Sequence, residues 1–172
     1  MARPNALFNH IALSVPDAQA AVDWYTKLFG LEVLVPVITQ KATDPDGPTL
    51  RKIYGPQANE MKMAILSCGN DVGLEIFEFV DPPYSGPNPK TEWNAHAYTR
   101  GGAFHFSLTV QNVDEKVDEV VKAGGSVIGE VIELAPGTRV CYTQDPWGNV
   151  VELLDLTINQ LYLKVFAGGA RG

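Results

Sequence analysis

The sequence predicts an α+β protein made of two tandem copies of a βαβββ unit. Sliding the chain on itself by the separation of His10 and His105 aligns the two histidines and a series of matching residues that follow them. The last strand of each copy also repeats, because Leu74–Phe79 and Val151–Leu156 share the order apolar, acidic, apolar, apolar, acidic, apolar. Matches at both ends of the unit indicate that the whole unit is duplicated.

Each copy is expected to begin with a strand and to continue with a helix. Residues 8–15 and 104–110 alternate with period two, which places His10 and His105 on the more polar face of their strands. Apolar residues recur at helical spacing in 18–29 and 113–123, and glycines that can end a helix follow both segments. Three further strands are expected in each copy, at 32–37, 61–67 and 72–80 in the first and at 126–134, 139–144 and 150–156 in the second.

The remaining segments are expected to connect these elements. The first unit spans 6–80 and includes an insert at 41–60, which is rich in proline, glycine and charge and predicts a long, functional loop. Residues 81–102 contain four prolines and predict an extended connector. The second unit spans 103–157, and a tail at 158–172 is expected to pack on the surface or to fray.

Composition narrows the possible functions. Of the 172 residues, 45 % are hydrophobic, which is enough for a buried core. The net charge of −7 and the pI of 4.9 disfavour nucleic acid, and no apolar run of about 18 residues indicates a membrane span. Cys68 and Cys141 lie singly in apolar segments and are expected to be reduced thiols. We therefore expect a cytoplasmic protein that acts on a small molecule.

The repeated unit and its motifs resemble the vicinal oxygen chelate superfamily, which includes glyoxalase I, bleomycin resistance proteins and extradiol dioxygenases. The resemblance covers roughly residues 6–157 and is closest to the glyoxalase-like isomerases and lyases. The motifs that carry it are Asn9–Asp17, Trp24–Leu31, Gly73–Phe77, Phe104–Leu108 and Asp145–Glu152. In this superfamily two curved mixed sheets form a cup around a metal ion.

The resemblance also implies the metal ligands. The matching positions on the first and last strands of the two units are His10, Glu75, His105 and Glu152. Two imidazoles and two carboxylates suit one divalent ion, Zn, Ni, Co, Fe or Mn, and leave open positions for substrate. The superfamily pairs its units within one chain or across a dimer, and a homodimer is expected here by resemblance.

Other polar and aromatic residues have more than one interpretation. Glu78 and Asp155 lie three positions beyond the glutamates, on the opposite face of a regular strand, and are expected to be structural. His96 is either an ordinary loop residue or a substrate contact, and Arg100, like the other loop cations, either clamps a carboxylate or is solvated. The candidates for substrate binding are Phe77, Tyr142, Leu154, Arg100 and His96.

The resemblance implies an isomerase, epimerase or lyase that acts on a small oxygenated substrate. The metal would stabilise an enolate, and Glu152, with Glu75, would move the proton next to the carbonyl group. A ferrous dioxygenase would use His10, His105 and Glu152 as ligands of iron. Glu75 would then occupy a coordination position that the enzyme needs for its substrate or for oxygen. A metal-free, bleomycin-resistance-like binding protein would not need the ligands that this chain retains.

The substrate is expected to be uncharged or aromatic. Glutathione thioesters are anionic, and residues 32–38 offer no basic side chain to bind them. Aromatic and aliphatic residues alternate with the same period as the glutamates and are expected on the same face of their strands, which predicts an apolar cup instead.

Overall fold

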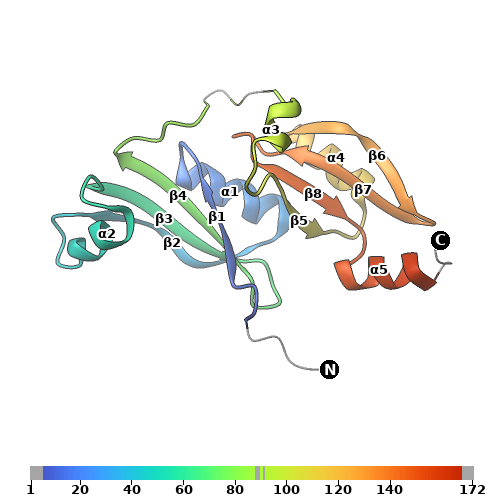
Figure 1. The fold of residues 1–172 in the computed structure, drawn as a ribbon, viewed down its shortest axis with the longest axis horizontal. Coiled ribbons are helices and arrows are strands. Elements are labelled where there is room, and N and C mark those ends of the chain that lie inside the picture. Colours follow the sequence, from blue (N-terminus) through green and yellow to red (C-terminus); the bar gives the residue numbers. More distant parts are fainter. Residues whose placement is uncertain (1–5, 88–89, 91, 168–172) are drawn as a thin grey trace. The chain divides into compact units, whose positions relative to one another are not determined.

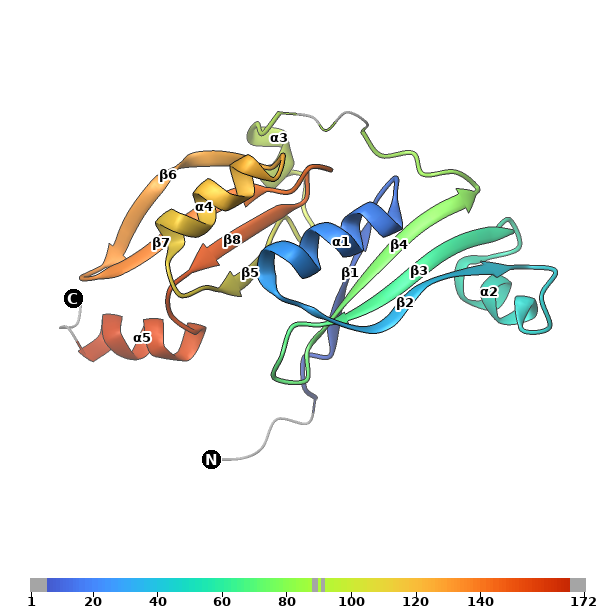
Figure 2. The same ribbon diagram turned by 180° about the vertical axis from the view of Figure 1, so that it is seen from behind.

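A computed structural model of the protein describes residues 6–87, 90 and 92–167, and the chain divides after Gly86 into two compact units (Figures 1 and 2). The first unit contains β1 His10–Ser14, α1 Ala18–Phe29, β2 Glu32–Lys41, α2 Gly47–Tyr54, β3 Glu60–Ser67 and β4 Gly73–Asp81. The second contains α3 Ala95–Thr99, β5 Phe106–Thr109, α4 Val113–Lys122, β6 Ser126–Ala135, β7 Thr138–Gln144, β8 Val150–Leu154 and α5 Ile158–Ala167.

The two sheets share one topology. Their strand orders are β1-β4-β3-β2 and β5-β8-β7-β6, so the first and last strands of each unit are neighbours. These neighbours pair in parallel, whereas the other strands pair antiparallel, and both sheets are therefore mixed. The predicted α+β fold of two βαβββ units is confirmed.

One amphipathic helix covers one face of each sheet, α1 in the first unit and α4 in the second (Figure 2). Asp17 caps α1 by accepting a hydrogen bond from the Ala20 N–H at 3.0 Å, and Asn112 caps α4 in the same way. Gly30 ends α1 with a φ of 68°, a left-handed conformation that favours glycine. Within the described residues, no helix is long and apolar enough to cross a membrane.

Strand alternation divides the side chains of β4 between the two faces of its sheet. Leu74 and Ile76 are fully buried, whereas Glu75 lies between them on the opposite face. Glu78 has the parity of Leu74 and Ile76, and its carboxylate accepts hydrogen bonds from the Ala18 N–H at 2.9 Å and from Lys62 at 2.7 Å. The predicted structural role of Glu78 is confirmed, since it caps the start of α1.

Asp155 also has a structural role in the second unit, but it differs from that of Glu78. Its carboxylate accepts a hydrogen bond from the Arg139 N–H at 2.9 Å and so joins the end of β8 to the neighbouring strand. The predicted turn at Asp145–Gly148 is also present, because the buried Asp145 carboxylate accepts hydrogen bonds from the Trp147 and Asn149 N–H groups. Gly148 lies in this turn and has a φ of 93°, a conformation that favours glycine.

The expectation of a loop throughout 41–60 is wrong. The strand β2 continues to Lys41 despite Pro36, because β2 is an edge strand and its register with β3 shifts around this residue. The insert then forms α2, in which Leu50 and Tyr54 pack on Phe77 of β4. The insert is therefore partly a second layer on the face of the sheet that carries Glu75.

The connector and the tail also contain helices that the sequence pattern did not predict. In the connector, Asn94 caps the short helix α3, and residues 88, 89 and 91 lie outside the described residues. The tail forms α5, whose Leu161 is buried in a cluster with Val140 and Leu154. Residues 168–172 lie outside the described residues.

We expect α5 to contribute to the stability of the second unit through Leu161. Replacing this residue with alanine should reduce the free energy of unfolding by about 2–4 kcal/mol, because it leaves a cavity above Val140 and Leu154. Leu163→Ala is the matched control on the same helix, since Leu163 is 71 % exposed. Urea denaturation of both variants measures the difference. Equal midpoints would mean that α5 does not stabilise the sheet.

Candidate metal site

The first unit places one histidine and one glutamate side by side on the open face of its sheet. Glu75 of β4 pairs with Ala12 of β1, and His10 lies two residues before Ala12 on the same face. The His10 Nε2 atom is 3.3 Å from the Glu75 Oε2 atom. Gly73 faces His10 across the strands, and a Cβ atom there would lie 3.2 Å from the His10 Cβ atom. The small residue thus leaves room for the imidazole.

The side-chain amide of Asn9 determines which nitrogen of His10 carries the proton. The other nitrogen then has the lone pair that faces Glu75. The His10 Nδ1 atom is 2.6 Å from the Asn9 Oδ1 atom. An amide oxygen only accepts, so Nδ1 carries the proton, and in the neutral imidazole Nε2 keeps a free lone pair. This lone pair points toward a carboxylate, and the two acceptors attract each other only through a shared proton or a cation.

The second unit repeats the arrangement. Ser107 of β5 pairs with Glu152 of β8, and His105 lies two residues before Ser107. The His105 Nε2 atom is 3.6 Å from the Glu152 Oε2 atom, and the two side chains are 26 % and 16 % exposed. The His105 Nδ1 atom is buried and has no hydrogen-bonding partner among the described residues. The two pairs thus agree in geometry but differ in the support of the histidine.

The geometry of both pairs suits two ligands of one divalent ion. Separations of 3.3 and 3.6 Å are longer than a good N–H···O hydrogen bond. Ligand atoms about 2.1 Å from one ion, at angles of about 90° to 120°, lie about 3.0–3.6 Å apart. Each unit by itself therefore has two donors at the spacing that a shared ion requires, and the hydrogen bond from His10 to Asn9 is the usual outer support of a metal-binding histidine.

Neither pair is a complete metal site. Across residues 6–87, 90 and 92–167, no three His, Cys, Asp or Glu side chains gather closely enough to hold an ion. Two protein ligands bind a divalent ion weakly, whereas structural and catalytic sites use three or four. An ion held by either pair would therefore need further ligands, and we call each pair a half-site.

A tyrosine accompanies each glutamate. Tyr142 of β7 pairs with Glu152 across the strands, and its ring packs edge-on against His105 with the centroids 5.1 Å apart. Burial, followed by the charge of Glu152, raises the pKa of Tyr142, so the hydroxyl stays protonated and remains a donor. In the first unit, burial and then the charge of Glu75 raise the pKa of Tyr54.

The other sequence candidates for substrate binding lie in different surroundings. Phe77 is buried below α2 and stacks with Phe79, and Leu154 is buried below α5. His96 is exposed on α3, and Arg100 is the residue that ends this helix. The described contacts bring neither of these last two to the half-site of the second unit, and their roles stay predictions.

Sequence reasoning missed Tyr54, because it treated the insert as a loop. The available signal was Pro48 near a helix start, followed by Leu50 and Tyr54 at a spacing of four residues. Both side chains lie on the face of the sheet that carries Glu75, where Tyr54 packs against Phe77 and Phe79.

The cysteines do not contribute to the site. Cys68 and Cys141 are free, as expected, and burial raises the pKa of both thiols. A raised pKa disfavours the thiolate, which is the form that binds metals and attacks electrophiles.

Comparisons with known proteins agree with this architecture. The sequence model of the Glyoxalase/Bleomycin resistance protein/Dioxygenase superfamily matches residues 7–153. A 2-epi-5-epi-valiolone epimerase from Actinomyces sp. is 29 % identical over 86 % of this chain and 78 % of its own length. A lactoylglutathione lyase from Escherichia coli O157:H7 is 25 % identical over 85 % of this chain and 90 % of its own. A glyoxalase family protein from Bacillus cereus has the same fold, with a TM-score of 0.71 over 90 % of this chain and 97 % of its own at 20 % identity.

We expect the purified protein to hold a divalent metal with an affinity that depends on Asn9. Asn9→Ala should weaken metal binding about 10- to 100-fold, because the Nδ1 proton of His10 loses its acceptor. Asn9→Asp should retain the affinity, since a carboxylate also accepts this hydrogen bond. Elemental analysis and chelator competition measure the effect, with His105→Ala and Glu75→Gln as variants that remove or weaken the ligands themselves. A wild type that stays free of metal after reconstitution would contradict the half-site interpretation.

Proposed function

The chain belongs to the glyoxalase, bleomycin resistance protein and dioxygenase superfamily, and we propose that it is a metal-dependent isomerase, epimerase or lyase. The observation that carries this proposal is the repeated histidine–glutamate pair, with Nε2–Oε2 separations of 3.3 and 3.6 Å. His10, Glu75, His105 and Glu152 would together hold one ion, of Zn, Ni, Co, Fe or Mn. Relatives that include an epimerase and lactoylglutathione lyases support this class of reaction.

The proposed reaction moves a proton on the carbon next to a carbonyl group. When bound, the ion would act as a Lewis acid and stabilise the negative charge that develops on the carbonyl oxygen. Glu152 and Glu75 are the groups that can take and return the proton, because they are the acids on the open faces of the two sheets nearest to the histidines. Inversion at carbon requires a proton acceptor on one side and a donor on the other, and two glutamates from two units satisfy this requirement.

Tyr142 would hold Glu152 in position during this transfer. The two residues are cross-strand partners, and burial with the charge of Glu152 raises the pKa of Tyr142. The hydroxyl therefore stays protonated near neutral pH, where it can donate to the carboxylate and does not compete as a base. Glu152 then keeps its second oxygen for the proton or the ion. Tyr54 lies close enough to Glu75 to be influenced by its charge, and we assign it the corresponding place in the first unit.

The equivalence of the two pairs favours this function over a dioxygenase. A ferrous dioxygenase needs two histidines and one carboxylate, with open positions for oxygen and substrate. Here Glu75 is placed beside His10 as Glu152 is placed beside His105, which supports a ligand set of four. A binding protein without metal would gain nothing from either pair.

The surroundings of the half-sites favour an uncharged substrate. In the first unit, aromatic and apolar side chains cover the sheet beyond Glu75, namely Tyr54, Met61, Met63, Phe77 and Phe79. Two cations that the sequence offered as partners for an acidic substrate are engaged elsewhere, since Lys62 pairs with Glu78 and Arg139 with Asp114, each at 2.7 Å. We therefore propose a neutral α-hydroxyketone rather than a glutathione thioester.

We further propose that a homodimer completes the site, with the first unit of one chain facing the second unit of its partner. Subunits of His10→Ala and His105→Ala, when mixed and exchanged, should then regain activity, because a mixed dimer has one site with all four ligands. Random exchange would restore about one quarter of the wild-type sites. Light scattering checks the dimer, and the activity of the mixture checks the pairing. A dimer without any recovery would mean that each chain builds its site alone.

Proton exchange tests the proposed chemistry directly. With 2-hydroxycyclohexanone in D2O, the metal-loaded protein should exchange the proton next to the carbonyl, as followed by NMR. Glu152→Gln should slow this exchange at least about 100-fold, because the amide cannot accept the proton. Glu78→Gln is the matched control, since Glu78 caps α1 on the other face and its loss should lower stability without stopping exchange. Exchange that survives Glu152→Gln, or a clear preference for lactoylglutathione, would refute the mechanism or the neutral substrate respectively.

A further inference from the structure

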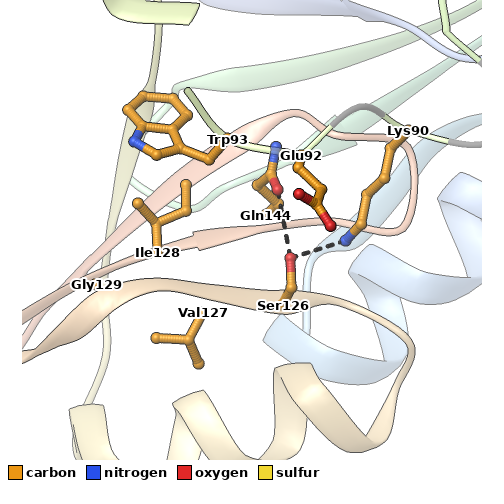
Figure 3. Close-up of a pocket in the computed structure, with 8 residues that line it drawn as sticks. All are labelled: Lys90, Glu92, Trp93, Ser126, Val127, Ile128, Gly129 and Gln144. Atoms are coloured by element: carbon orange, nitrogen blue, oxygen red, sulfur yellow. Dashed lines mark hydrogen bonds between the residues drawn. The ribbon is translucent and has the colours of Figure 1, made fainter. Parts of the chain in front are cut away.

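The second unit contains a pocket of about 500 Å³ between the connector and the sheet (Figure 3). Its lining residues are Lys90, Glu92, Trp93, Ser126, Val127, Ile128, Gly129 and Gln144. Lys90, Glu92 and Trp93 come from the connector, and the others come from β6 and β7. Figure 3 shows the side chains of Ser126, Ile128 and Gln144 directed toward the connector, whereas Val127 points to the other side of β6.

The pocket opens on the face of the sheet that carries the half-site. Ile128 pairs with Tyr142, and Tyr142 pairs with Glu152, so these three side chains lie in one row on one face. Ser126 and Gln144 form the next row on that face, two residues along the strands and therefore about 7 Å away. The pocket and Glu152 therefore lie on one face of the same sheet, with Tyr142 between Ile128 and Glu152 in their row.

Several contacts fix the connector on the sheet and shape the pocket. The Lys90 ammonium donates hydrogen bonds to the Ser126 hydroxyl at 2.9 Å and to the Asp145 carbonyl at 3.1 Å. Gly148 permits this approach, because a Cβ atom there would lie 3.1 Å from the Lys90 Cβ atom. The Trp93 ring packs against Tyr98 and Phe104, with the centroids 5.5 and 6.5 Å apart.

The aromatic contacts also connect the pocket wall to the half-site. Phe104, which contacts Trp93, packs edge-on against His105 with the ring centroids 4.4 Å apart. Trp93 is therefore part of a continuous series of rings that ends at a proposed metal ligand.

The polar groups of the pocket offer both donors and acceptors. Among the described residues, the Lys90 ammonium uses two of its three N–H groups. The Gln144 amide donates to the Gly148 carbonyl at 3.3 Å, and within the same part of the chain it keeps one N–H group. The exposed Glu92 carboxylate also lines the pocket and supplies acceptors. Trp93 and Ile128 supply apolar surface between these groups.

This chemistry selects against charged and against fully apolar ligands. An anionic ligand would be attracted by Lys90 but repelled by Glu92, and a cationic ligand the reverse, so that neither gains enough to offset the loss of its hydration. A hydrocarbon would leave the polar groups without partners. A saturated ring with several hydroxyl groups satisfies all of them, since its C–H face can stack on the indole while its edge donates and accepts hydrogen bonds. We infer that the pocket binds a neutral polyhydroxylated ring, the part of the substrate that lies away from the reacting carbon. The inference rests on the proposed function only for the placement of that carbon at Glu152.

Binding can be measured without metal. The indole N–H signals of the chain's three tryptophans, recorded by NMR with EDTA present, report on Trp24, Trp93 and Trp147 separately. Titration with myo-inositol or glucose should shift the Trp93 signal most, and Trp93→Phe assigns it. Glucosamine and glucuronate, the cationic and anionic counterparts of glucose, should bind at least about fivefold more weakly, a difference of about 1 kcal/mol in binding free energy.

Glu92→Gln is the decisive variant, because Glu92 is exposed and the change keeps its shape. The Glu92→Gln variant should bind the neutral rings at least fivefold more weakly, and it should discriminate less against glucuronate. Glu130→Gln, on β6 outside the pocket, is the control and should change neither the affinity for the neutral rings nor this discrimination. Absence of a Trp93 shift with both neutral rings, or an unchanged Glu92→Gln variant, would overturn the inference even if metal and proton exchange are found. A shift that persists in His105→Ala while proton exchange is absent in the wild type would support the pocket and refute only the proposed function.

Discussion

The parallel pairing of the first and last strands of each unit is the constraint on which the rest of the site depends. It brings together residues that are far apart in the sequence, and its register places the histidine two positions before the partner of the glutamate in both units. A shift of one residue would move the glutamate to the face that α1 or α4 covers, where Glu78 and Asp155 now have structural roles. The apolar contacts of the covering helices thus fix the register, and through it the ligand geometry.

Both sheets need a second covering helix, and the chain supplies it from outside the repeat. Phe77 in the first unit and Leu154 in the second lie two residues beyond the glutamate and face the open side. The insert covers the first position with α2, and the tail covers the second with α5. Two unrelated segments therefore perform the same task, which is to remove apolar surface from water at one end of the open face and leave the glutamate end accessible.

The strands, the covering helices and the parity of the acids could be predicted from the sequence, because periodicity and the repeat both report on which face a residue occupies. The polar, proline-containing segment Gly47–Tyr54 could not be identified in the same way, since a helix of two turns gives a weak periodic signal. Lys90 and Trp93 were missed for another reason. Their place depends on contacts with Ser126 and Phe104, which are distant in sequence and leave no local pattern. The ligand set followed from resemblance and stays a prediction, since the described residues bring its members together only in pairs.

The two half-sites have also diverged in their immediate support. Asn9 holds the His10 ring, whereas the His105 Nδ1 atom has no partner among the described residues. Tyr142 accompanies Glu152 from the neighbouring strand, whereas Tyr54 reaches the neighbourhood of Glu75 from an inserted helix. Duplication alone would place the same partners around both histidines. Because the partners differ, a substitution at Asn9 or Tyr142 alters one pair and leaves the other as it was. The surroundings of each histidine can therefore evolve separately while the histidines and glutamates themselves stay unchanged.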